Sequence, residues 1–301
     1  MTVLTQRMRE ELVRRNYAAS TIRTYLMAIE EFRRHAQKRL DHLGPDDIRH
    51  YQVALLEDKK LAVGTVALRI SALRFFYLKV LKKYTLRYEL PYPKNPKWAR
   101  RLPTILTPEE MTRLIDSAKN LFHYAMLLTM YSCGLRRSEL CRLKVSDIDS
   151  QRMVVRVERG KGGADREIPL NQKLLETLRA HWRWLRPKTY LFPGTENGWR
   201  ADKPITPKIV WEAVQEASKR AGITKHVTPH TLRHCFASHM LEAGTDLRTI
   251  QILMGHRDME ATARYLHVSP KLLRAAVNPI DQIPVSGPTN RQRSRKLRKP
   301  E

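Results

Sequence analysis

The sequence predicts a mainly α-helical protein, in which a helical N-terminal domain precedes a mostly helical C-terminal domain with a small β-hairpin. Three observations support this fold class. Apolar residues recur at helical spacing through most of the 301 residues, a proline-rich stretch interrupts them, and one segment alternates like a hairpin. A chain of this length accommodates two domains, each with its own core. We expect domains at 1–83 and 104–285, a linker at 84–103 and a basic tail at 286–301.

The first 83 residues are predicted to form four helices. Helical periodicity covers 2–15, 20–39, 46–58 and 64–83. Ser20 and Asp46 are the expected N-caps, because short oxygen-bearing side chains accept backbone N–H groups at helix starts. Gly44 and Pro45 are expected to break the second helix from the third. Basic residues flank the apolar stripe of the fourth helix, which for a single helix usually means a solvated surface. The basic excess in all four helices favours a phosphate-facing surface instead.

The linker and the start of the second domain follow from proline placement. Residues 84–103 contain four prolines and five basic residues without a periodic pattern, which predicts an extended segment. Thr107 and Glu110 then form a capping box, with Pro108 at the first helical position. Helices are expected at 108–118, 121–132, 137–143, 171–186, 207–221, 229–243, 246–254 and 259–267. Gly134 is expected to end the second of them.

Strand patterns are few. MVVRVE at 153–158 and REIPL at 166–170 flank the turn RGKGGAD, which predicts a hairpin with Lys161 at or near its tip. LeuPhePro at 191–193 predicts one further short strand. The segment 286–301 has six basic residues, one acidic residue and no aromatic residue, so we expect it to be disordered.

Charge indicates a polyanionic partner. Lys and Arg total 56 against 30 Asp and Glu, which gives a net charge of +26, and the excess is shared by both halves of the chain. No apolar run is long enough to span a membrane, and the N-terminus lacks the apolar core of a secretory signal. Cys133, Cys141 and Cys235 lack CxxC spacing, so we expect free thiols in a cytoplasmic protein, which in a bacterium would associate with the nucleoid.

The segment TPHTLRH contains the first candidate site residues. Thr228 is the expected N-cap and Pro229 the first helical residue, so His230 and Arg233 project from one face of the first turns, where an anion is favoured. An isolated HxxR pair is a weak signal, because most such pairs are ordinary surface residues. Two further histidines of this helix, His234 and His239, are interpreted as packing or surface residues. Spacing of four between His230 and His234 hints only weakly at zinc, since no third ligand is evident.

Three further candidates are also weak when taken alone. Arg136 follows the helix-ending Gly134, and pairing with Glu139 is a sufficient structural explanation for it. His256 follows a glycine at the end of another predicted helix. Tyr265 lies in the next helix, where a packed aromatic is the more common role.

Together these motifs change the interpretation. Arg136, Lys161 at the hairpin tip, HTLR at 230–233, MGH at 254–256 and ARYLH at 263–267 occur in this order over nearly the whole chain. The chain thereby resembles the tyrosine recombinase (phage integrase) family. The resemblance implies that a helical core-binding domain and a catalytic domain clamp DNA. It implies catalytic roles for Arg136, Arg233, Lys161, His230 and His256, with Tyr265 as the nucleophile.

The resemblance also bears on two neighbours of the first arginine. Arg137 stands where the family usually has an aliphatic residue, and Arg136 is favoured as the catalytic arginine because it follows Gly134 and Leu135. Glu139 matches an acidic position of the family and is expected to orient the site.

These residue types fit phosphodiester chemistry. Two arginines supply permanently charged, planar forks for the phosphate oxygens. A tyrosine with an ordinary pKa near 10 needs a positive surrounding and a proton acceptor, and His230, Arg136 and Arg233 could provide them. Lys161 is a sensible acid for the leaving 5′-oxygen, while His256 is expected to bond the phosphate or Tyr265. The resemblance implies a 3′-phosphotyrosine intermediate, which retains the phosphoester energy so that no ATP is needed.

The predicted activity is therefore site-specific recombination of double-stranded DNA, with no cofactor and no metal, by a homotetramer that holds two DNA sites. Three alternatives remain: a type IB topoisomerase, a non-catalytic DNA-binding regulator and a metal-dependent recombinase with an acidic triad. The triad is disfavoured because Asp147, Asp149 and Asp165 are explained by loops and hairpin ends.

Overall fold

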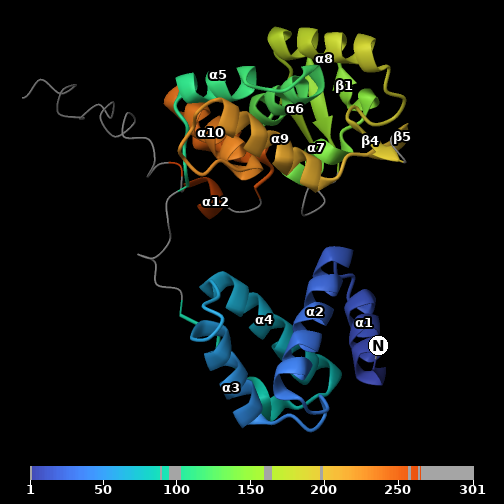
Figure 1. Cartoon of the computed structure of the whole chain (residues 1–301), viewed down its shortest axis with the longest axis vertical. Coiled ribbons are helices and arrows are strands. Elements are labelled where there is room, and N and C mark those ends of the chain that lie inside the picture. The colour runs from blue at the N-terminus through green and yellow to red at the C-terminus, as the bar shows by residue number, and fades with distance from the viewer. Residues whose placement is uncertain are drawn as a thin grey trace, which may run out of the picture. The chain divides into compact units, whose positions relative to one another are not determined.

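The computed structural model describes residues 2–88, 90–94, 103–158, 165–196, 199–256, 259–263 and 265. The chain divides into two compact units, Met1–Arg101 and Leu102–Glu301 (Figure 1). Within the described part of the chain, no helix is both long and apolar enough to cross a membrane.

The N-terminal unit contains the four predicted helices (Figure 1). They are α1 (Val3–Arg14), α2 (Ala19–Ala36), α3 (Pro45–Leu56) and α4 (Val63–Phe75), and α4 continues into a π-helical turn, η1 (Phe76–Val80). Their apolar faces meet in one core, whose largest fully buried side chains include Tyr51, Tyr77, Phe32 and Phe76.

Both N-caps predicted for this unit are wrong. The second helix begins after Ala18, so Ser20 is already inside it. The third begins after Gly44, because Pro45 has no N–H and suits the first helical position. Asp47, the third helical residue, accepts the Gly44 N–H at 3.0 Å, which is the reciprocal bond of a capping box, and Asp46 is left in the first turn.

The segment after residue 83 packs on the N-terminal unit, contrary to the predicted linker start. Tyr84–Arg87 form a short 3-10 helix, η2, and Leu86 and Leu90 are buried in the same core. Arg74 of α4 holds this segment by donating to the carbonyls of Arg87 (3.0 Å) and Leu90 (2.7 Å). Proline content alone therefore placed the boundary too early.

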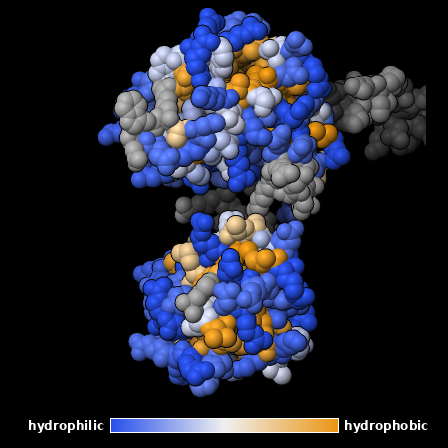
Figure 2. All heavy atoms as spheres, turned by 90° about the vertical axis from the view of Figure 1, so that its right-hand side faces the viewer, coloured by the Kyte–Doolittle hydropathy of each residue, from blue (hydrophilic) through white to orange (hydrophobic). Residues whose placement is uncertain are grey.

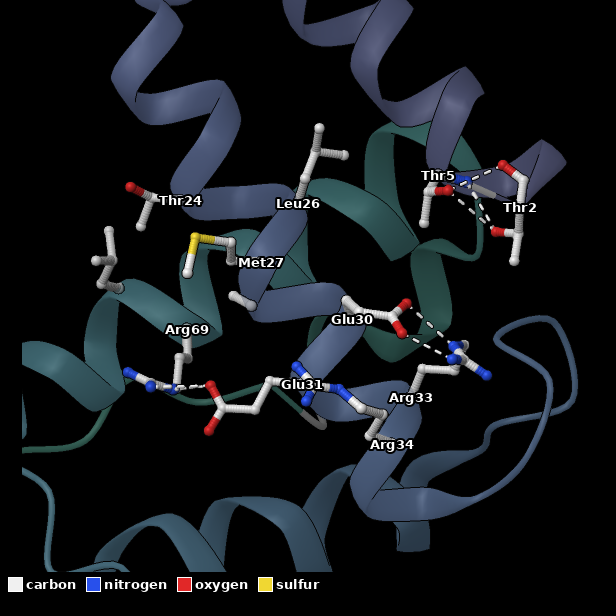
Figure 3. Close-up of a pocket in the computed structure, with 12 residues that line it drawn as sticks. Thr2, Thr5, Thr24, Leu26, Met27, Glu30, Glu31, Arg33, Arg34 and Arg69 are labelled. Carbon is white, nitrogen blue, oxygen red and sulfur yellow. Dashed lines mark hydrogen bonds and ion pairs between the residues drawn. The ribbon is translucent and has the colours of Figure 1, made fainter. Parts of the chain in front are cut away.

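A surface hollow of about 730 Å³ lies along α2 and α4 (Figure 3). Arg69 of α4 pairs with Glu31 of α2 at 2.9 Å, and Arg33 pairs with Glu30 at 2.7 Å. These carboxylates offset two of the positive charges that line the hollow, so it is not a concentrated anion site.

The C-terminal unit is mostly helical and is built around α6 (Leu121–Ser132), much of which is buried. Around it lie α5 (Pro108–Asp116), α7 (Arg137–Arg142), α8 (Gln172–Leu185), α9 (Pro207–Arg220), α10 (Pro229–Glu242), α11 (Leu247–Met254) and α12 (Glu260–Ala263). The predicted capping box is confirmed, since Thr107 and Glu110 each accept the other's backbone N–H. Cys133, Cys141 and Cys235 are free and buried, and burial raises the pKa of Cys141 and Cys235 to about 11.

Two small antiparallel sheets complete this unit. The predicted hairpin is present as β2 (Val154–Val157) and β3 (Arg166–Pro169), and β1 (Ile148–Asp149) extends it in the order β1-β2-β3. Its tip at 159–164, including Lys161, lies outside the described residues. The strand predicted at 191–193 begins only at its last residue, because Leu191 and Phe192 are buried in the core. It forms β4 (Pro193–Glu196), which pairs with β5 (Trp199–Pro204).

Candidate active site

The N-terminal part of α10 positions Arg233. Thr228 caps the helix by accepting the Thr231 N–H at 3.2 Å, and Pro229 occupies the first helical position, as predicted. Arg233 lies one turn further in and is only 3% exposed. Its guanidinium donates to the carbonyls of Gly134 and Met254. A buried cation is thus fixed to the turn after α6 and to the C-terminal end of α11 (Leu247–Met254).

Arg136 approaches from the turn between α6 and α7. Gly134 has a φ of +54°, and a Cβ there would lie 2.4 Å from the Phe236 ring, so this turn requires glycine. Arg136 is the N-cap residue of α7 and donates to Glu139 at 2.7 Å and to the Gly255 carbonyl at 3.0 Å. Arg137 is exposed on the same turn. This geometry supports Arg136 as the site arginine.

Glu139 lies at the centre of the arginine cluster and is 7% exposed. Besides Arg136, it receives two hydrogen bonds from Arg166 of β3, at 3.1 and 2.8 Å, and Arg233 lies 3.9 Å away. Burial by itself would raise the pKa of this carboxyl, but the bonds and charge of Arg166, followed by Arg136, lower it to about 2. Both earlier interpretations of Glu139 thus agree with the structure, because the side chain pairs with Arg136 and also orients it.

The three arginines converge on the C-terminus of α11. Arg166 Nε donates to the Leu253 carbonyl at 2.7 Å, Arg233 to Met254 and Arg136 to Gly255. These are consecutive carbonyls at the end of a helix, where backbone oxygens lack helical partners and the dipole is negative. The cluster therefore fixes the position of the chain just before His256.

His256 is anchored within its own loop. Its Nδ1 lies 2.9 Å from Thr262 Oγ1, and its backbone N–H donates to Gln251 at 3.1 Å. Gln251 in turn donates through Nε2 to the His256 carbonyl at 3.2 Å.

Tyr265 is 1% exposed and packs with Phe236 and Met254, among others. Its hydroxyl lies 2.9 Å from Nδ1 of His234 on α10. His234 was interpreted as a packing or surface residue, so the structure gives it a role that sequence reasoning missed. The sequence does contain a signal for this role, because His234 lies four residues after His230 and next to Arg233. The same spacing is also that of a zinc-ligand pair, which is the only meaning that the sequence analysis gave it.

The electrostatics of α10 favour an anion. Packing around His230 lowers its pKa, although much of the residue is exposed, and the charge of Arg233 lowers it further. Smaller contributions come from the arginines of the α6–α7 turn. Burial, followed by the charge of Arg136, lowers the pKa of Arg233 to about 9. The guanidinium still carries its charge at neutral pH and interacts electrostatically with Tyr265.

Among the described residues, no group of three or more His, Cys, Asp and Glu side chains has the arrangement of a metal site. Asp147 accepts the Lys144 N–H, and Asp149 accepts those of Gln151 and Arg152. These bonds are local loop contacts, as the sequence analysis inferred for both residues.

Comparison with known families decides the identity of this arrangement. Residues 104–271 match the model described as the phage integrase family, and residues 4–85 match its N-terminal SAM-like domain. The chain belongs to the phage integrase family of tyrosine recombinases. The predicted enzyme class, a tyrosine-type site-specific DNA recombinase, is thereby confirmed, and no comparison favours a topoisomerase or a regulator.

Individual relatives agree with this assignment. A putative integrase/recombinase, y4qK, from Sinorhizobium fredii is 47% identical over 290 residues, which cover 96% of this chain and 92% of that protein. Tyrosine recombinase XerA from Pyrococcus horikoshii is 38% identical over 75% of this chain and 76% of its own.

Solved structures show the same fold. A crystal structure of XerA recombinase has a TM-score of 0.52 at 30% identity and covers 90% of this chain and 95% of its own. A lambda integrase dimer bound to a COC′ core site has a TM-score of 0.70 at 20% identity and covers 87% of this chain and 93% of its own. The predicted fold class is therefore confirmed.

Proposed function

We propose that this recombinase cuts one strand of a DNA duplex by attack of Tyr265 on a phosphodiester, which leaves a 3′-phosphotyrosine and a free 5′-hydroxyl. The observation that supports this most directly is the placement of the Tyr265 hydroxyl against α10, the helix that also contains Arg233. Because Glu139 ties Arg136 to the same cluster, the charges that would meet the phosphate are held in position before DNA arrives.

The remaining site residues have distinct proposed tasks. Arg136 and Arg233 stabilise the charge that develops on the two nonbridging oxygens. His230 lies at the exposed start of α10 and donates to the phosphate, and His256 approaches from the α11 end. Lys161, at the hairpin tip outside the described residues, protonates the leaving 5′-oxygen. The covalent bond conserves the phosphoester energy, so rejoining requires no nucleotide cofactor.

Both units are proposed to contact double-stranded DNA. The net charge of +26 is shared between them, and the faces seen in Figure 2 are largely hydrophilic with scattered apolar patches. We assign the core-binding role to the N-terminal unit and catalysis to residues 104–285. We place the start of the linker after Leu90, because Leu86 and Leu90 are buried in the N-terminal core. In a bacterial cell the protein would act at the nucleoid.

Strand exchange is proposed to occur in a homotetramer on two DNA sites. A solved lambda integrase structure shows a tetramer bound to a Holliday junction, and its fold resembles this chain with a TM-score of 0.70. The segments 271–285 and 286–301 lie outside the described residues.

A suicide substrate tests this proposal. A duplex nicked close to the cleavage point loses the short fragment after attack, so the wild-type protein should accumulate as a covalent adduct at the 3′-phosphate. Tyr265→Phe should retain DNA binding and form no adduct, because only the nucleophilic oxygen is removed. Tyr131→Phe is the matched control, since Tyr131 also bonds a histidine of α10, and it should still form the adduct. Peptide mapping of the adduct to another residue would refute the assignment.

A further inference from the structure

One side of α10 presents three polar side chains toward the proposed reaction centre. His230, Arg233 and His234 are spaced i, i+3 and i+4, so they share one face of the helix. The ring centroids of His230 and His234 are 6.3 Å apart. The two histidines are therefore neighbours with different surroundings, the first at the exposed helix start and the second against Tyr265.

His234 contacts the atom that would react. Its Nδ1 lies 2.9 Å from the Tyr265 hydroxyl oxygen, which is a normal hydrogen-bond length, and the two ring centroids are 5.8 Å apart. The interaction is partly buried, and Tyr265 also interacts electrostatically with the adjacent Arg233. A base and a positive charge thus both act on this hydroxyl.

A second pair on the same helix shows how such a bond is built for structure alone. His239 Nδ1 lies 2.8 Å from the Tyr131 hydroxyl, and its Nε2 lies 2.9 Å from the Leu106 carbonyl. A carbonyl only accepts, so the His239 proton is on Nε2 and Nδ1 accepts from Tyr131. This pair links α10 to α6 and to the start of the unit, and none of its printed bonds involves Arg136 or Glu139. It provides a matched comparison for His234.

We propose that His234 orients the Tyr265 hydroxyl and accepts its proton during attack, a role beyond the HxxR histidine His230. The inference rests on Tyr265 being the nucleophile. In the step, the Tyr265 O–H bond breaks and its proton passes to Nδ1 of a neutral His234. The phenolate oxygen bonds to phosphorus, and the bond to the 5′-oxygen breaks. The leaving oxygen takes a proton from a separate acid, and Arg233 offsets the charge of the phenolate.

The test separates proton acceptance from positioning. Asparagine places its amide close to the position of Nδ1, so His234→Asn keeps a hydrogen-bond partner for Tyr265 but cannot take up a proton. Adduct formation is measured on a suicide substrate with a sulfur at the 5′-bridging position, which leaves without protonation and so isolates attack. His234→Asn should slow attack by about a hundredfold to ten-thousandfold, the usual contribution of a general base. DNA binding should remain intact.

Fluorinated tyrosine at position 265 provides the deciding readout. Ring fluorines lower the phenol pKa, so the nucleophile ionises without a base, and the effect of His234→Asn should shrink to severalfold. His239→Asn, the matched control, should lower the melting temperature yet slow attack little with either tyrosine.

If His234→Asn slows attack as much with fluorotyrosine as with tyrosine, His234 only positions the ring, and the proposal that it accepts the proton is overturned. If His234→Asn attacks at the wild-type rate while Tyr265→Phe is inactive, the role of His234 is refuted and the assignment of Tyr265 as the nucleophile is unaffected. Adduct formation by Tyr265→Phe would instead remove the proposed function itself.

Discussion

Glu139 is a single carboxylate buried among three guanidinium groups. Removing charges from water costs several kcal/mol per ion, so a buried ion pair adds little to stability compared with apolar packing. Its value here is geometric, because Glu139 holds Arg136 and Arg166 by direct bonds and both arginines hold the end of α11. The site arginines are thus positioned by a group that need not touch DNA.

Glu139→Gln should destabilise the C-terminal unit by about 3–5 kcal/mol, because it leaves buried arginines without their counter-charge. Chemical denaturation measures the free energy of unfolding. Glu167→Gln is the matched control, since Glu167 pairs with Arg152 at 2.8 Å on the surface, where such pairs contribute roughly 0–1 kcal/mol. Equal losses in the two variants would contradict the central role of Glu139.

The same carboxyl predicts a pH dependence. The pKa of this carboxyl is lowered in the folded protein to about 2 from its ordinary value of 4.5, so the folded state favours the ionised form. The stability it contributes is therefore present above about pH 4.5 and is lost as the pH falls toward 2. Melting temperatures measured over this window should fall less steeply in Glu139→Gln than in the wild type. Parallel profiles would show that other carboxyls account for acid unfolding.

The proposed role of Lys161 as the acid can be tested although this residue lies outside the described part of the chain. Lys161→Ala should slow cleavage of ordinary DNA but act much less on a substrate with a 5′-bridging sulfur, because a thiolate leaves without a proton donor. Adduct formation on both substrates gives the comparison. If both slow equally, Lys161 binds DNA and another group is the acid.

At the residue scale, candidate site residues could be proposed from the sequence where the chemistry is encoded locally. Arg136 and Arg233 follow from short motifs, and the structure brings both to Glu139. Arg166 was missed because it belongs to the hairpin and meets Glu139 only through tertiary packing. Its register offered a signal, since Arg166 and Ile168 are both buried while Glu167 between them is exposed. A charge at an inward strand position implies a buried partner.

At the scale of elements, the predicted helix starts are correct where a capping threonine is followed directly by a proline at the first helical position. Thr107 before Pro108 and Thr228 before Pro229 are both confirmed caps. Ser20 failed because the helix begins earlier, at a residue with no capping side chain, where packing of α2 on its neighbours outweighs local preference. The second hairpin was missed because a Gly-rich, polar sequence at 193–204 lacks the β-branched alternation on which strand prediction depends.

The turn after α11 gives an element-scale prediction. Gly255 has a φ of +60°, and a Cβ there would lie 3.1 Å from Arg166 Nη1 and 3.2 Å from its Cδ. Gly255→Ala should therefore cost about 1 kcal/mol from the left-handed backbone and also displace the cluster, which slows adduct formation. Gly222→Ala is the matched control, because Gly222 has a φ of +65° with nothing near the added methyl. We expect a larger stability loss in Gly255→Ala than in Gly222→Ala, and slower cleavage in Gly255→Ala alone. Unchanged cleavage in Gly255→Ala would show that this turn does not position the site.

At the scale of the whole molecule, the two units have separate cores. The linker start predicted at residue 84 is too early, because a proline-rich segment can still bury leucines, here Leu86 and Leu90, against the preceding helices. A fragment cut after residue 83 would expose that part of the core. The proper N-terminal fragment is therefore 1–94.

Fragments 1–94 and 103–301 should each fold and bind a DNA site weakly, while the intact chain binds it far more tightly. Tethering makes the second contact intramolecular, so its effective concentration reaches the millimolar range for a short linker. Both units are basic, so the intact chain should also release more counterions and show the steeper dependence of affinity on salt. Titration of a fluorescent duplex at several salt concentrations measures both quantities, and an equimolar mixture of the two fragments is the control. If one fragment matched the affinity and salt slope of the whole protein, the other unit would make no contact with DNA, and the two-unit clamp would have to be abandoned.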